Sequence, residues 1–208
     1  MTSEPGLLAR ARELRCERGG RAVCAPQSFS VRAGQALWLR GRNGSGKTSL
    51  LRVLAGLAAP AGGDLWRAPH TGILYAGHQN AVKDDLSLFE NLQFLAQLGQ
   101  LHAADADVQA ALRHWGLWAS RHRPARMLSQ GLRRRLSLAR LSLADQRALW
   151  VLDEPFDALD DDGVAVLVAQ LYAHHVRGGA TVLSSHLSWP SGAAEPDQHW
   201  LHPPGAQA

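Results

Sequence analysis

The chain has 208 residues, which is enough for one domain, or for one domain with a subdomain, and for a large buried core. Hydrophobic residues make up 46% of it, as in globular proteins, and no run of eighteen apolar residues is present, so we expect no segment to span a bilayer. The net charge of +4 would suit nucleic acid or an anionic membrane surface, but the basic residues are dispersed, which favours an ordinary soluble protein.

The cysteines and the N-terminus bear on the cellular compartment. Cys16 and Cys24 match no spacing typical of a zinc or redox motif, which favours the reducing cytosol. Residues 1–6 lack a basic region before a long apolar run, so no signal peptide is expected. If the protein works at a membrane, we expect another chain to supply the part that spans it.

The first part of the chain predicts short strands, turns and one helix. Residues 7–40 read as short strands with a turn at Gly19-Gly20, and the last of these strands covers residues 36–39. The same signals then predict, in order, a helix at 49–54, a turn at 60–64 and a buried strand at 72–77.

The second part predicts a helical block followed by further strands. Apolar residues recur near the helical period between about 86 and 147, and residues 149–152 form a short apolar run typical of a central parallel strand. Residues 164–176 predict a helix, residues 181–184 a buried strand, and the tail from 190 to 208 a loop or frayed end.

Alternation of strands and helices predicts an α/β fold with a mostly parallel sheet flanked by helices. We expect a single domain over residues 1–208, with a small antiparallel β region and a helical subdomain inserted at about 83–147.

The segment Gly41–Thr48 fits the phosphate-binding pattern G-x-x-x-x-G-K-[S/T], between a predicted strand and a predicted helix. The glycines let the backbone turn its N–H groups toward a phosphate, and the helix N-terminus adds its positive dipole end. Lys47 could then reach the β- and γ-phosphates, and the Thr48 hydroxyl could ligate Mg²⁺. The residues predicted to bind the nucleotide are Gly41, Arg42, Asn43, Gly44, Ser45, Gly46, Lys47, Thr48 and Ser49. A glycine-rich turn before an ordinary helix is the alternative, but it would not require Lys-Thr at this offset. The sequence therefore predicts a P-loop NTPase core.

Two acids end the apolar run at 149–152, where a phosphate-bound metal would lie. Asp153 is predicted to hold Mg²⁺, through its water shell, and Glu154 to act as general base on the attacking water. A strand that merely ends in acids before Pro155 is the alternative, and the P-loop makes it the weaker one.

Three weaker signals surround these motifs. Ser129 and Gly131 precede a predicted helix and could bind phosphate or only cap that helix. Gln79 follows a buried strand, where its amide could sense metal or attacking water, and His186 follows another, where its ring could contact the γ-phosphate.

In this order the motifs resemble those of the ATP-binding subunits of ABC transporters, over about residues 8–188. The resemblance makes Gly41–Thr48 the Walker A motif, Leu149–Asp153 the Walker B motif, Gln79 the Q-loop, Leu128–Gly131 the signature and His186 the H-loop. It makes Asp157–Asp160 the D-loop. It also implies a head-to-tail homodimer with two ATP molecules at the interface, where Ser129 and Gly131 face the γ-phosphate held by the other protomer. Gln79, like Thr48 and Asp153, would then act on Mg²⁺.

The segments at 75–80, 86–92, 133–141 and 149–156 look like the heme exporter ATP-binding subunit of cytochrome c maturation. That resemblance implies an ATPase at the cytoplasmic face of the inner membrane, bound peripherally to integral membrane permease subunits. It would power heme export, or release of a heme-loaded carrier. The alternatives are the ATPase subunit of another exporter, a soluble ABC-type ATPase acting on nucleic acid, and a module that binds nucleotide without hydrolysing it.

The sequence departs from the family pattern at two places. Leu132 follows the signature where Gln or Glu is usual, and the adenine-stacking aromatic expected near Glu17-Arg18 is missing. We expect no direct contact with nucleic acid, because Arg133, Arg134 and Arg135 are interpreted as residues flanking the signature helix, either solvated or paired across the dimer.

The chain itself is not expected to bind heme, since histidines such as His174 and His175 on a helix are more often plain surface. Trp115 and Trp118 are interpreted as core packing, with contact to a membrane partner as the alternative.

Overall fold

Residues 4–144, 149–191, 193 and 195–204 are described by the computed structural model and fold into two units. The core unit contains the described residues up to Gly77, then 149–155, and the chain from His174 on. The helical unit contains residues 78–144 and 156–173. It therefore begins five residues before the expected subdomain boundary, and it also takes in most of a helix that lies after the Walker B strand.

A five-stranded parallel sheet organises the core unit. Its order is β10 (Asp197–Trp200), β5 (Ala36–Arg40), β9 (Ala180–Ser184), β8 (Leu149–Asp153) and β7 (Ile73–Ala76). Every residue of β8 and β9 is buried, as their continuous apolar runs require of central parallel strands. Because the strands are parallel, β5, β8 and β9 all end at the same edge, with Asp153 and Leu39 both opposite Ser184. That edge carries the predicted site.

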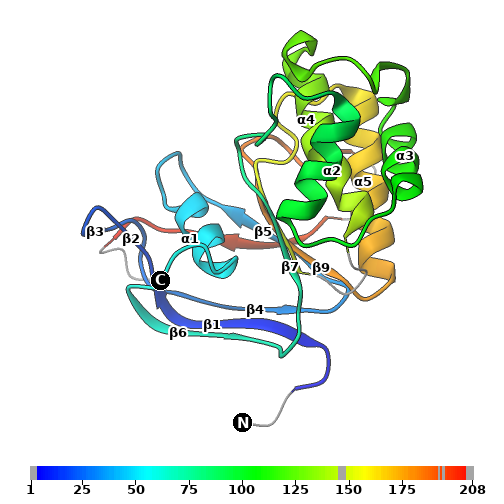
Figure 1. The fold of residues 1–208 in the computed structure, drawn as a ribbon. Helices are drawn as coiled ribbons and strands as arrows, with labels where there is room; N and C mark the ends of the chain where they lie inside the picture. The colour runs from blue at the N-terminus through cyan, green and yellow to red at the C-terminus, as the bar shows by residue number, and fades with distance from the viewer. Residues whose placement is uncertain (1–3, 145–148, 192, 194, 205–208) are drawn as a thin grey trace. The chain divides into compact units, whose positions relative to one another are not determined.

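A three-stranded antiparallel sheet completes the core unit, with β1 (Leu7–Arg15) between β4 (Gln27–Arg32) and β6 (Gly62–Arg67) (Figure 1). A short hairpin joins β2 (Glu17–Arg18) to β3 (Arg21–Ala22) through the expected turn at Gly19-Gly20. Helix α1 (Lys47–Leu54) buries Leu50, Leu51 and Leu54 in one cluster with residues of both larger sheets. Contacts with both sheets therefore hold in place the helix that begins at the P-loop.

Two expectations about this unit were wrong. Residues 62–67, expected to begin with a turn, form strand β6, because they pair with β1. Glycine fits at position 63, where a side chain would meet the Glu13 carbonyl. The tail is not all loop either, because Asp197–Trp200 pairs with β5 and Leu201 enters the core at 4% exposure. The sequence of this segment is polar and lacks the apolar run of a buried strand, because the strand lies at the edge of the sheet.

The helical unit contains α2 (Leu88–Leu98), α3 (Asp105–His114), α4 (Gln130–Ala139) and α5 (Asp161–Val176, of which residues up to 173 belong here). The 3-10 turns are η1 (Trp118–Ser120), η2 (Ala125–Met127) and η3 (Arg140–Leu143). Ser87 and Glu90 start α2 with a capping box, in which each side chain accepts a hydrogen bond from the other's backbone N–H. Trp115 is fully buried and donates to Ser142 Oγ at 3.2 Å, so its interpretation as core is confirmed. Trp118, given the same interpretation, is only partly buried and lies against the guanidinium groups of Arg113 and Arg121. Among the helices of the described residues, none has the length and apolar character needed to cross a membrane.

Candidate functional site

The P-loop lies between β5 and α1, and three of its glycines adopt positive φ. These values are 148° for Gly41, 80° for Gly44 and 92° for Gly46, which caps α1. A Cβ on Gly41 would lie 2.6 Å from Ser45 Oγ, so only glycine leaves the loop its tight turn. Lys47 folds over the loop, where its Nζ donates to the carbonyls of Gly41 at 2.9 Å and Arg42 at 3.3 Å.

A buried hydroxyl inside this loop, that of Ser45, favours binding of a phosphate. Ser45 Oγ is buried and has no hydrogen-bond partner among the described residues. Leaving such a group unpaired costs about 1–3 kcal/mol, and an anionic oxygen of a bound phosphate would relieve that cost. The P-loop residues therefore fit the nucleotide that the sequence predicts.

Asp153 joins the P-loop helix to the sheet. Thr48 Oγ1 donates to Asp153 Oδ2 at 2.8 Å, and Ser184 Oγ donates to Asp153 Oδ1 at 2.7 Å. The carboxylate is only 2% exposed, so both oxygens are held in place. A carboxylate and a hydroxyl are the hard oxygen donors that Mg²⁺ prefers, and their pairing fits a magnesium site.

Glu154 follows in a strained conformation, with φ of 48°, which a non-glycine residue rarely adopts. Its backbone N–H donates to Ser184 Oγ at 3.0 Å, which holds that turn. The Oε2 atom accepts from the His186 backbone N–H at 2.9 Å and lies 3.1 Å from His186 Nδ1. The structure thus brings the predicted base and the predicted γ-phosphate sensor into contact.

The core unit also shows a residue that sequence reasoning missed. Ser184 is fully buried, and its hydroxyl serves both Asp153 and the Glu154 backbone. A serine at the end of an otherwise apolar strand was the available signal, because a buried hydroxyl needs partners.

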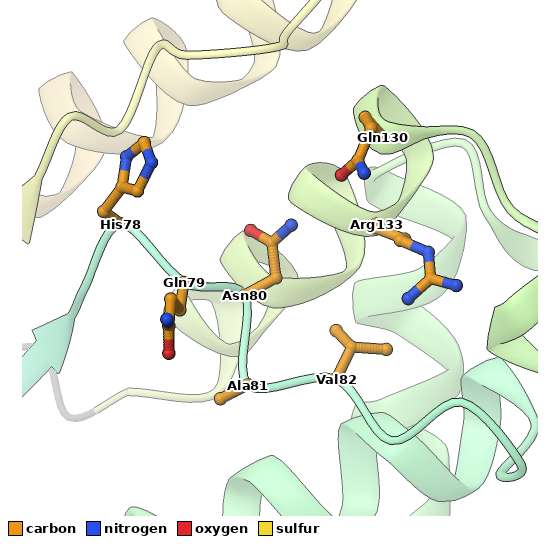
Figure 2. Close-up of a pocket in the computed structure, with 7 residues that line it drawn as sticks. All are labelled: His78, Gln79, Asn80, Ala81, Val82, Gln130 and Arg133. Atoms are coloured by element: carbon orange, nitrogen blue, oxygen red, sulfur yellow. The ribbon is translucent and has the colours of Figure 1, made fainter.

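In the helical unit, Gln79 lies exposed on the loop after β7. This loop and α4 line an open pocket of about 310 Å³ (Figure 2). The lining residues are His78, Gln79, Asn80, Ala81, Val82, Gln130 and Arg133. Arg134 ties the loop to the helix, since its Nη1 donates to Asn80 Oδ1 at 3.3 Å.

Ser129 and Gly131 start α4 and lie beside the D-loop. The Ser129 hydroxyl caps the helix by accepting from Leu132 N–H at 3.3 Å. A Cβ on Gly131 would lie 2.9 Å from the carbonyl oxygen of Ala158, whose own φ of 61° is left-handed. Glycine is therefore needed at position 131, where the predicted signature meets the predicted D-loop.

The arginine run does not stay solvated, because all three side chains pair within the helical unit. They also lie on α4 itself rather than beside it. Arg133 pairs with Asp84 at 2.6 Å, Arg134 is 2% exposed, and Arg135 binds Asp160. Hydrogen bonds from Arg135, and from the Gly163 backbone, hold the pKa of Asp160 below its ordinary value. This pairing removes the main sequence argument for nucleic acid.

Four other residues singled out in the sequence, two cysteines and two histidines, lie in the core unit. Cys16 and Cys24 are buried free thiols. His174, expected at the surface, is fully buried, and its ring stacks on Trp150 with 3.7 Å between centroids. The ring fits there because residue 179 is glycine, where a Cβ would come within 2.1 Å of it.

Comparison with known proteins assigns the family. Residues 24–157 match the ABC transporter family. The chain is 46% identical to the cytochrome c biogenesis ATP-binding export protein CcmA of Cupriavidus necator, over 83% of this chain and 80% of that protein. It is 49% identical to the protein of the same name from Paramagnetospirillum magneticum, over 85% of this chain and 86% of the relative.

Solved structures agree on the fold. An ABC transporter ATP-binding protein of Pyrococcus furiosus superposes with a TM-score of 0.77 at 22% identity, covering 93% of this chain and 96% of that one. With a family match over most of the chain and relatives near half identity, the chain belongs to the ABC transporter ATP-binding proteins, and among them to the cytochrome c biogenesis ATP-binding export proteins.

Proposed function

We propose that this protein is the ATP-hydrolysing subunit of an ABC-type membrane complex in c-type cytochrome biogenesis, where it powers heme export or the release of a heme-loaded carrier. The observation that carries the proposal is the contact between Glu154 and His186 beside the Thr48–Asp153 pair, in a chain so similar to cytochrome c biogenesis export proteins. A base, a metal-binding pair and a phosphate loop are the parts that hydrolysis requires.

The residues of the core unit would each do one part of the work. Bound ATP and Mg²⁺ supply the phosphoryl group and the charge that stabilises its transfer. The P-loop from Gly41 to Ser49 holds the phosphates, with Lys47 turning from its carbonyl contacts toward them. Thr48 and Asp153 would hold the metal, Asp153 through its water shell, and Glu154 would take the proton of the attacking water while His186 orients that carboxylate.

The helical unit would complete the site from a second copy of the chain. In a head-to-tail homodimer, Ser129 and Gly131 would face the nucleotide held by the partner's P-loop. Gln79 would report the state of the metal and the water to the permease subunits at the cytoplasmic face of the membrane. The Ser129 hydroxyl is consistent with this role, since a helix N-terminus favours an anion.

The test is covalent-heme staining of c-type cytochromes in host cells that carry either the wild-type chain or Glu154→Gln at matched protein level. We expect staining to disappear while b-type cytochromes persist, because the variant keeps the site's shape but lacks the base. Glu195→Gln, at an exposed position, is the matched control. Unchanged staining in Glu154→Gln cells would contradict the proposed role in c-type cytochrome biogenesis. Loss of b-type cytochromes as well would point to a general defect in heme supply.

A further inference from the structure

The backbone N–H and the ring of His186 both contact the Glu154 carboxylate. The His186 side chain is about half exposed, at 53%. The segment Ser185–Trp189, here called the H-loop segment, leaves β9 at Ser184 and carries His186 to the Glu154 carboxylate. Ser185 Oγ accepts from Leu187 N–H at 3.1 Å, which makes the segment a tight local turn.

Trp38 touches this segment at both ends. The side chain lies on β5 opposite Leu183 of β9 and is 2% exposed. Its Nε1 donates to the Ser185 carbonyl at 3.3 Å, and its ring lies 5.6 Å from the Trp189 ring in a tilted arrangement. One side chain therefore contacts both the residue before His186 and the last residue of the segment.

Trp38 is itself held in place. The Arg40 guanidinium lies 3.9 Å from the Trp38 ring centroid, a cation–π contact, and 5.2 Å from the Trp200 ring. A buried indole N–H needs an acceptor, and the one it has here is the backbone just before the predicted sensor. Burial, a hydrogen bond and two ring contacts make this indole a rigid support.

We propose that Trp38 is a positioning residue of the ATPase site, which holds the H-loop segment so that His186 stays against Glu154. Trp38 acts through the Ser185 carbonyl and the Trp189 ring. The inference rests on the roles proposed above for Glu154 and His186. It predicts that loss of the indole N–H slows turnover without weakening ATP binding, because the P-loop is unchanged.

The test is a double-mutant cycle on the purified full-length chain, with steady-state ATPase activity giving kcat and KM for ATP. Trp38→Phe keeps a ring but lacks the N–H donor. We expect its kcat to fall about tenfold, the effect of one lost hydrogen bond, with KM unchanged within about twofold. In a His186→Ala background, the same change should alter kcat by less than about twofold, because the residue it positions is gone.

Trp115→Phe is the matched control, since it also removes the indole hydrogen bond of a fully buried tryptophan, to Ser142 in the helical unit. It should leave kcat near the wild-type value. If Trp38→Phe does not fold, Trp189→Leu removes the contact at the other end and enters the same cycle.

An equal fall in kcat with and without His186 would overturn the inference, as would a rise in KM that accounts for the whole effect. If Glu154→Gln and His186→Ala both retain full turnover, the proposed function itself fails, and the role of Trp38 fails with it. If those two variants turn over more slowly, with a residual kcat that the cycle can measure, and Trp38→Phe is not slowed, only the role of Trp38 is wrong.

Discussion

Thr48 and Asp153 are 105 residues apart in the chain, yet the Thr48 hydroxyl donates a 2.8 Å hydrogen bond to the Asp153 carboxylate. This bond links the first turn of α1 to the end of β8 and brings together the two oxygen groups that fit Mg²⁺. Ser184 also bonds to the Asp153 carboxylate. A substitution that removes the Thr48 hydroxyl would therefore leave Asp153 Oδ2 in place without its donor.

Thr48→Val should lower the affinity for ATP in the presence of Mg²⁺ by about 10- to 100-fold, the range seen when a group supporting a metal site is lost. Thr48→Ser, which keeps the hydroxyl, should restore most of it. Isothermal titration of ATP, with Mg²⁺ and with EDTA, separates a loss of metal binding from a change in the phosphate-binding loop. A loss of equal size in EDTA would show that Thr48 serves the loop and not the metal.

Ser129 should have two separable roles. Ser129→Ala removes the cap of α4 and should cost about 1 kcal/mol of stability, whereas Ser129→Asn keeps a side chain that caps equally well. If the hydroxyl also serves the partner's nucleotide, both variants should lose about tenfold in kcat. Thermal unfolding and ATPase assays on the same preparations check this. Recovery of kcat together with stability in Ser129→Asn would make Ser129 a helix cap alone.

Gly179→Ala should destabilise the core unit by about 1–3 kcal/mol, because the new methyl group would overlap the buried His174 ring, which Trp150 prevents from moving. Gly72→Ala is the control, since nothing lies within 4 Å of a Cβ there. Urea unfolding gives both free energies. Equal stability of the two variants would mean that the His174 ring can leave its place against Trp150.

Stability should fall with pH as His175 is protonated. Burial lowers the pKa of His175 to about 4 from an ordinary value of 6.5, and its Nε2 lies 2.9 Å from Thr181 Oγ1. Between these values the unfolded chain binds a proton that the folded chain does not, so stability present above pH 6.5 is lost as the pH falls toward 4. Because only one proton is involved, this group can contribute at most about 1.4 kcal/mol per pH unit within that range.

His175→Gln should flatten that dependence, while His102→Gln, at an exposed histidine, should leave it unchanged. Urea unfolding at pH 7.0, 6.0 and 5.0 measures the slope for each chain. If the slope of His175→Gln equals that of the wild type, other groups carry the acid sensitivity.

Much of this protein could be predicted from the sequence by itself, because its strongest signals are local. The P-loop between Gly41 and Thr48 needs glycines at fixed offsets, and the short apolar runs at β8 and β9 are typical of central parallel strands. These patterns predict the parallel sheet and place the expected nucleotide site at one of its edges.

Only the tertiary structure decided the contacts that depend on residues far apart in the chain. The polar segment Asp197–Trp200 becomes a strand because β5 offers it an edge. Arg133 and Arg135 pair with acids from other parts of the helical unit, and Arg134 bonds to the Asn80 amide. Ser184 and Trp38 carry no motif, and they matter because folding places a hydroxyl beside Asp153 and an indole beneath the H-loop segment. Such roles arise from packing and hydrogen bonding across the sheet, which no local pattern encodes.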